Sequence, residues 1–160
     1  MTQHKDEHEG RVIENRKARF NYHILETLEV GIVLRGTEVK SVRDGKVSIA
    51  EGYVRAEENP LSLALYGVNI DPYGPGGPRQ HNPRRLRQLL ARKREIAKLA
   101  REVQQKGMTI VPLKLYFKNG YAKLLIGLGK GKSKTDKRQT IAKREAGREI
   151  ERAISRRQDR

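Results

Sequence analysis

The sequence predicts a mainly β fold: a small antiparallel OB-like barrel with one packed amphipathic helix, a short helix between strands and a basic C-terminal tail. Roughly six short apolar runs are separated by turn residues, as in small all-β domains. One longer segment has helical periodicity instead. A length of 160 residues suits a single domain with tails.

The first half of the chain predicts strands and one short helix. Residues 15–19 form a short basic turn or helix, and residues 22–34 form a strand with a bulge or bend at Gly31. Residues 36–45 have apolar side chains at helical spacing and end in Gly45, which predicts a short helix.

Two further strands are predicted over residues 47–54 and 61–70, with a turn at Asn59-Pro60 between them. A loop rich in Gly and Pro follows over residues 71–82. Residues 85–105 predict the longest helix of the domain. Its apolar stripe comprises Leu86, Leu89, Leu90, Ile96, Leu99 and Val103.

The folded part ends in a predicted β-hairpin. Residues 109–117 and 121–128 are apolar runs joined by Asn119-Gly120, which favours a tight hairpin turn. Gly127, Gly129 and Gly131 are expected to mark the end of the core. We therefore divide the chain into a disordered leader (1–12), an OB-like barrel (13–129) and a basic tail (130–160) that is disordered when free and helical on an anionic surface.

The positive charge is unevenly distributed, and its location points to RNA. The net charge is +16; residues 1–77 carry −2, residues 78–106 carry +8, residues 107–129 carry +3 and residues 130–160 carry +7. Like charges gathered in one segment and one tail repel each other, and a phosphate backbone relieves that repulsion. The tail repeats arginine every four residues, which predicts a cationic helical stripe on an anionic surface. A solvated, nonspecific charged tail is the alternative.

Several kinds of chemistry are not predicted. The stretch from Gly127 to Ser133 resembles a P-loop but lacks its spacing, so we interpret it as a flexible lysine-containing hinge. The histidines form no metal-ligand set, there are no cysteines, and no apolar run is long enough to cross a membrane. Glu26 and Glu38 lack a nucleophile or pocket motif, so a hydrolase is a remote alternative. We expect no enzyme, cofactor or metal, and a cytoplasmic protein without a secretory signal.

Several motifs in one order then identify a family. They are Asn15-Arg16-Lys17-Ala18-Arg19, Gly36-Thr37-Glu38-Val39-Lys40-Ser41, Pro112-Leu113-Lys114-Leu115-Tyr116-Phe117, Gly129-Lys130-Gly131-Lys132 and Asp136-Lys137-Arg138. Together they resemble the small protein B family, the bacterial partners of transfer-messenger RNA (tmRNA). The resemblance implies binding to the tRNA-like domain of tmRNA and its delivery to stalled ribosomes, where the nascent chain is tagged for proteolysis. The implied partners are tmRNA, small-subunit ribosomal RNA and, through the tmRNA complex, elongation factor Tu, with the protein a monomer.

The resemblance also assigns site residues. Those expected to serve tmRNA binding are Asn15, Arg16, Lys17, Arg19, Tyr22, Glu29, Leu90 and Lys123. Lysine meets phosphate, tyrosine stacks on bases, and Asn or Glu bonds to a base edge or 2′-OH. Those expected in the decoding centre and mRNA channel are Lys130, Lys132, Lys134, Asp136, Lys137, Arg138, Arg144, Arg148 and Arg152. Thr135 departs from the bulkier residue usual in the family before Asp136.

Two readings of the function remain at the level of sequence. The first is ribosome rescue with tmRNA. The second is a general OB-fold RNA binder or chaperone with a nonspecific basic tail. Leu90 has an alternative too, because its place on the apolar stripe favours packing over RNA contact.

Overall fold

The computed structural model describes residues 9–158. Its elements in chain order are β1 (Glu9–Glu14), α1 (Arg16–Asn21), β2 (Tyr22–Ile32), α2 (Gly36–Arg43), β3 (Val47–Ser48), β4 (Tyr53–Glu58), β5 (Leu61–Tyr66), β6 (Asn69–Ile70), the 3-10 turn η1 (Gly74–Gly76), β7 (Arg87–Leu90), α3 (Lys93–Lys106), β8 (Thr109–Lys118), β9 (Tyr121–Gly131) and α4 (Lys134–Gln158).

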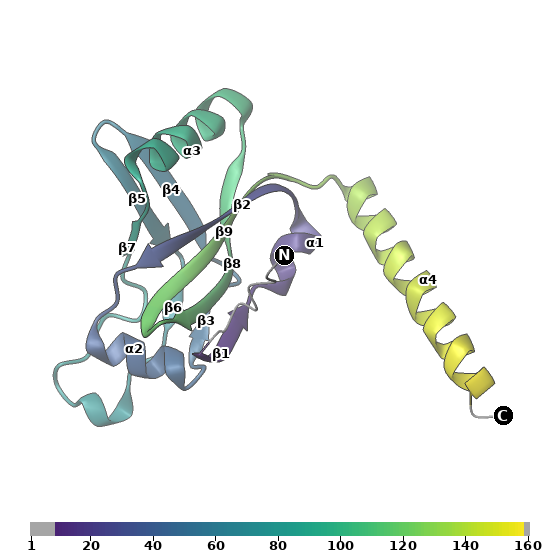
Figure 1. The fold of residues 1–160 in the computed structure, drawn as a ribbon, viewed down its shortest axis with the longest axis horizontal. Coiled ribbons are helices and arrows are strands. Elements are labelled where there is room, and N and C mark those ends of the chain that lie inside the picture. The colour runs from purple at the N-terminus through teal and green to yellow at the C-terminus, as the bar shows by residue number, and fades with distance from the viewer. Residues whose placement is uncertain (1–8, 159–160) are drawn as a thin grey trace.

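The main sheet is antiparallel and has seven strands in the order β1-β8-β4-β5-β7-β2-β9. Strand β8 also pairs with β9, so the pairing from β8 through β4, β5, β7 and β2 to β9 returns to its start. The predicted hairpin is confirmed: Asn119 and Gly120 have φ of 52° and 77°, as a tight hairpin turn requires. Figure 1 shows α3 across one end of the sheet and α2 near the other.

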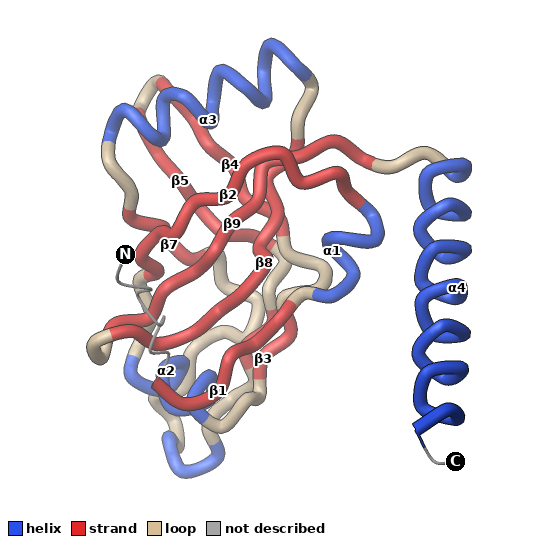
Figure 2. Tube along the Cα trace, turned by 45° about the vertical axis from the view of Figure 1, so that its right-hand side comes forward, coloured by secondary structure: helices blue, strands red, loops and turns tan. Residues whose placement is uncertain are grey.

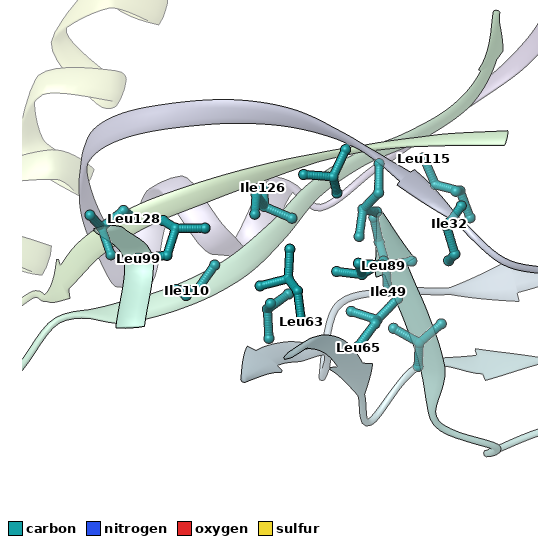
Figure 3. Packing of buried hydrophobic residues seen from close by; sticks show 14 of the residues in the cluster. Ile32, Ile49, Leu63, Leu65, Leu89, Leu99, Ile110, Leu115, Ile126 and Leu128 are labelled. Carbon is teal, nitrogen blue, oxygen red and sulfur yellow. The ribbon is translucent and has the colours of Figure 1, made fainter. Parts of the chain in front are cut away.

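The core lies between the strands and under α3. Leu65, Leu115 and Leu124 have no exposed surface, and Ile96 and Leu99 of α3 join the same cluster. Figure 3 shows side chains from β2, β5, β7, β8 and β9 converging on this centre. Because burying a large aliphatic side chain contributes about 2 kcal/mol, this cluster is the main stabilising feature of the sheet.

The predicted helix over residues 85–105 is wrong in its first part. Residues 87–90 form strand β7, in which Arg87 and Leu89 are buried while Leu90 is exposed. This alternation has the period of a strand. The helix α3 begins only after Arg92, whose backbone N–H donates to the Glu95 carboxylate at 3.0 Å. Leu86, Leu89 and Leu90 also fit the spacing of an apolar helix face, and this fit led to the wrong prediction of a helix at these positions.

Two predicted strands are each divided in two. Residues 47–54 contain β3 and the start of β4, and residues 61–70 contain β5 and β6. Gly67 has φ of +71°, and a Cβ there would lie 2.6 Å from the Glu51 carbonyl oxygen. The turns at these positions let β3 and β6 pair as a separate two-stranded sheet.

The predicted leader is shorter than expected. Residues 9–12 belong to β1, which pairs with β8 as an added strand at the edge of the main sheet. Ile13 of β1 lies opposite Leu115 and packs against the core. Free backbone groups on β8 can hold even a polar segment in a ladder. Residues 1–8 of the predicted leader lie outside the described residues.

The end of the core is later than predicted, and the expected hinge over residues 127–133 is a strand as far as Gly131. Gly127, Gly129 and Gly131 are all in β9, which pairs with β2 up to Gly131 opposite Tyr22. A Cβ at Gly129 would lie 2.3 Å from the His23 carbonyl oxygen. Glycine is therefore required for the close approach of the two strands.

Helix α4 stands away from the sheet, as Figures 1 and 2 show from two directions. None of its residues is buried. Its first turns lie beside α1, where Lys137 and Arg144 approach the ring of Phe20. The described contacts of the tail with the rest of the protein therefore lie in the first half of α4.

Candidate nucleic-acid interface

Most of the predicted RNA-binding residues gather on two surfaces. One, which we call the β7 patch, is formed by Glu29, Gly31, Leu90, Arg92 and Lys123. The other, which we call the α1–α4 groove, is lined by Arg16, Arg19, Lys114, Arg144 and Arg148, with Asn15 and Leu113 at its base and Glu14 at its edge.

The β7 patch is a shallow depression of about 530 Å³. Gly31 of β2 lies at its centre, opposite Leu90 of β7 on one side and Lys123 of β9 on the other. A Cβ at Gly31 would lie 3.2 Å from the Leu90 Cβ, so glycine lets Leu90 lie across the sheet. Leu90 is 55% exposed, which contradicts packing as its role and leaves it available for contact.

The charged groups of the β7 patch differ in their freedom. Glu29 is held on β2, because it accepts a hydrogen bond from the Tyr116 hydroxyl and lies 3.7 Å from the Lys118 ammonium. Within the described chain the Lys123 ammonium makes no ion pair or hydrogen bond. Lys123 is thus free to meet a phosphate, and Glu29 is oriented to accept a hydrogen bond.

The α1–α4 groove, of about 360 Å³, brings arginines from two distant segments together. Arg16 and Arg19 come from α1, and Arg144 and Arg148 come from α4. The acidic residue at its edge, Glu14, lies 3.8 Å from Lys114. Like charges on both sides of one groove favour an anion between them.

Asn15 is placed differently from the prediction. It is 7% exposed, and its side chain N-caps α1 by accepting from the Ala18 N–H at 3.2 Å. Its amide donates to the Pro112 carbonyl at 2.9 Å. Because both ends of the side chain are used by the fold, Asn15 holds α1 in position, and direct bonding to an RNA base does not fit this geometry.

Lys17 and Tyr22 flank a third concavity on the other side of α1. Tyr22 is half-buried against Ala18 and Val111, and the exposed Lys17 ammonium lies 3.9 Å from Glu51. The same concavity includes Tyr53 from β4. No spacing in the sequence links these residues, since the register of β4 and β8 brings them together.

The start of the tail is ordered by its own side chains. The Asp136 N–H donates to the Ser133 hydroxyl at 3.2 Å, and the Ser133 N–H donates to the Asp136 carboxylate at 3.1 Å, which is a capping box. Hydrogen bonds from Ser133, helped by His23 at 3.3 Å, hold the pKa of the Asp136 carboxyl below its ordinary value. Asp136, in the first turn of α4, is therefore an anion at neutral pH.

The other predicted tail residues lie before and after this start. Lys130 is exposed at the end of β9, and the Lys132 ammonium donates to the Thr140 hydroxyl at 3.0 Å. Lys137 and Arg144 lie 5.9 Å and 5.8 Å from the Phe20 ring centre. The predicted tail residues Lys134, Arg138, Arg148 and Arg152 are exposed along α4.

The sequence did not identify Gly31, Arg92 and Lys114 as members of these surfaces, or Phe20 as the ring that α4 approaches. Lys114 carried a partial signal, since it lies within a family motif. The other three depend on strand register or on the position of α4, which no local pattern reveals.

The carboxylates considered for catalysis are engaged elsewhere. Glu38 is fully buried between Arg85 and Arg87, and the Arg87 Nε donates to it at 2.8 Å. Burial by itself raises the pKa of Glu38, but these hydrogen bonds outweigh it and hold the pKa below its ordinary value. Glu26 is on the surface, 2.7 Å from the Lys98 ammonium. Neither is placed as a general acid or base in a shared pocket.

Within residues 9–158, no group of three or more acidic, histidine or cysteine side chains could hold a metal ion. Among the helices described there, none is both long and apolar enough to cross a membrane.

Comparisons with known proteins identify the family of this chain. The family model described as "SmpB protein" matches residues 12–156. The SsrA-binding protein of Carboxydothermus hydrogenoformans is 52% identical over 143 residues, covering 89% of this chain and 95% of the relative. The SsrA-binding protein of Anoxybacillus flavithermus is 49% identical over 151 residues, covering 94% and 97%.

A solved structure described as "tmRNA-SmpB: a journey to the center of the bacterial ribosome" is 47% identical, with a TM-score of 0.64, and the match covers 81% of this chain and 94% of that one. The family model and the relatives each span most of the chain. The extent of both matches shows that the chain belongs to the SmpB family.

Proposed function

We propose that this chain binds tmRNA and acts with the ribosome in trans-translation, the rescue pathway that tags the nascent chain. Family membership and the SsrA-binding relatives support this function. The observation that carries it in the structure is the β7 patch, in which residues far apart in sequence lie side by side on β2, β7 and β9.

The β7 patch receives the tRNA-like domain of tmRNA. Lys123 meets a phosphate, Glu29 accepts a hydrogen bond from a base edge or 2′-OH, and Leu90 makes apolar contact with an unstacked base or ribose. Gly31 keeps the floor of the patch flat so that RNA approaches the backbone. Asn15 contributes indirectly by holding α1.

The tail serves the ribosome. Asp136, Lys137 and Arg138 lie at the decoding centre, and the arginines from Arg144 onward follow the empty mRNA channel, where ribosomal RNA stabilises the helix that a free cationic tail forms poorly. Arg16 and Arg19 add charge on the same side as the tail. The protein acts as a monomer in the cytoplasm and meets elongation factor Tu through tmRNA.

The fold and chemistry fit this role. An OB-like barrel is supported by the pairing cycle in which β9 returns to β8. A non-enzymatic role is supported by the engagement of Glu38 and Glu26 in ion pairs. Catalysis of tagging then belongs to the ribosome.

The first test is binding to the tRNA-like domain of tmRNA at about 150 mM salt with excess bulk tRNA. We expect tight binding that survives the competitor. Lys123→Ala should weaken it roughly tenfold, the effect of one charge-assisted hydrogen bond. Lys106→Ala, at the far end of α3, is the matched control and should have no effect. If tRNA removes the protein completely, the general RNA-binding function replaces this proposal.

The second test separates body from tail. A chain ending at Gly131 should retain tmRNA affinity within about threefold, because the β7 patch is untouched, and should lose tagging of a stalled nascent chain on the ribosome. Tagging by the shortened chain would show that the tail has no essential role.

A further inference from the structure

A buried tyrosine next to the β7 patch reaches one of its charged groups. Tyr116 of β8 is only 3% exposed, and its hydroxyl donates a hydrogen bond to the Glu29 carboxylate. A hydrogen bond to a carboxylate is charge-assisted, so it is stronger than one between two neutral groups. The Lys118 ammonium, also from β8, lies 3.7 Å from the same carboxylate. Glu29 belongs to β2, yet its carboxylate is held toward β8.

The register of the sheet places Lys123 beside this hydrogen bond. Strand β9 lies between β2 and β8, with Lys123 opposite Tyr116 on one side and Gly31 on the other. Glu29 lies two residues before Gly31 on β2, so it is a diagonal neighbour of Lys123 on the same face of the sheet. Diagonal neighbours are about 7–8 Å apart, which long side chains can bridge. The two charged groups of the β7 patch can therefore reach each other.

The structure nevertheless keeps these two groups apart. Within the described chain Lys123 makes no ion pair, whereas Glu29 is engaged by Tyr116 and Lys118. An ion pair between Lys123 and Glu29 would withhold both charges from a bound RNA, because the pair would have to break first. A site whose groups are already held in binding geometry loses less free energy on association.

We propose that Tyr116 is a positioning residue of the β7 patch. Its hydroxyl holds Glu29 away from Lys123, so that an RNA meets a free ammonium and a fixed carboxylate. Tyr116 acts through Glu29 and does not itself touch RNA, because its side chain is buried. This role rests on the RNA-binding function proposed above and explains how the patch stays open before RNA is bound.

Tyr116→Phe tests this role, because it keeps the ring and removes only the hydroxyl. Binding of the full-length variant to the tRNA-like domain of tmRNA should weaken roughly fivefold, since the RNA must then break an exposed Lys123–Glu29 ion pair. In a Glu29→Gln background the same change should weaken binding less than about twofold, because no carboxylate remains to capture Lys123. Tyr121→Phe, at a tyrosine of β9 that is 72% exposed, is the matched control and should bind like the original protein.

A second measurement uses the protein without RNA. A nuclear Overhauser effect between the Lys123 and Glu29 side chains should appear in Tyr116→Phe and be absent from the original protein. Thermal unfolding of each variant checks that the sheet is intact.

Two results would overturn the role of Tyr116: an equal loss of affinity with and without the Glu29 carboxylate, or an unchanged Overhauser spectrum in Tyr116→Phe. Failure of the original protein to prefer tmRNA over bulk tRNA would instead contradict the proposed function. In that case the Overhauser measurement still decides whether Tyr116 keeps Glu29 and Lys123 apart.

Discussion

At the scale of single residues, the buried ion pair of Glu38 and Arg87 determines how the chain between β6 and β7 is held. Arg87 donates to Glu38 at 2.8 Å, to the Val68 carbonyl at 2.8 Å and to the Pro83 carbonyl at 2.9 Å. Thr37 of α2 bonds to His81, which in turn reaches the Ile70 carbonyl. These bonds tie the Gly/Pro-rich loop to α2 and position β7, on which Leu90 of the β7 patch lies.

Glu38→Gln should destabilise the protein by about 3–5 kcal/mol, because it leaves the fully buried Arg87 without its counter-charge. Urea unfolding measures this change. Glu26→Gln is the control, since it removes one member of an exposed pair and should cost less than about 1 kcal/mol. A similar loss of unfolding free energy in both variants would contradict the larger cost expected for the buried Glu38–Arg87 pair.

The same carboxylate predicts a pH dependence. In the folded state, the pKa of Glu38 is lower than its ordinary value of 4.5. The charged carboxylate therefore contributes to stability above pH 4.5, and this contribution is lost as the pH falls through the folded-state pKa. Unfolding free energy of the original protein should therefore decrease in acid below about pH 4.5 more steeply than that of Glu38→Gln. Parallel curves for the two proteins would contradict this assignment.

The RNA-contact residues assigned from the sequence stay predictions, and the structure shows which of them are exposed and which are bonded within the fold. Lys123 and Glu29 were expected near RNA and lie on one exposed patch. Asn15 was expected there too, yet its amide is consumed by the Pro112 carbonyl and its oxygen by α1. The sequence identifies a polar side chain but does not reveal which backbone groups surround it.

At the scale of elements, the β2–β9 pair carries Glu29, Gly31 and Lys123 of the β7 patch, and it depends on Gly129. A Cβ there would lie 2.3 Å from the His23 carbonyl oxygen, which belongs to rigid backbone. Gly129→Ala should therefore cost about 3 kcal/mol, measured by urea unfolding. Gly131→Ala, two residues along the same strand, meets nothing within 4 Å and should change stability by less than about 0.5 kcal/mol. A reversed order would show that β2 and β9 are not held so closely.

The hairpin and helix α3 could be predicted from the sequence because their signals are local. Asn119-Gly120 specifies a turn, and Ile96 and Leu99 repeat at helical spacing. Strand β7 could not. Its four residues form a strand because β2 and β5 supply partners on both sides, an influence absent from the segment itself.

At the scale of the whole molecule, the two basic segments of the sequence lie apart in space. Residues 78–106 place Leu90 and Arg92 at the β7 patch, while α4 carries the tail charge away from the sheet. Family motifs in one order specified this organisation better than composition did, because a net charge alone does not fix where cations gather.

Removing residues 132–160 should leave the unfolding free energy of the remaining domain within about 0.5 kcal/mol, because α4 has no buried residue and its contacts with the domain are exposed. The effect of the tail should appear in ribosome binding. Each phosphate neutralised contributes about 0.7 to the slope of log affinity against log salt on single-stranded RNA. If the tail arginines lie along ribosomal RNA, the full chain should show a slope steeper by about 2 or more than that of the shortened chain. On the tRNA-like domain of tmRNA the two slopes should agree, since the β7 patch is common to both. A tail that steepens both slopes equally would be a nonspecific anchor, and the charge at residues 130–160 would then carry no ribosome-specific role.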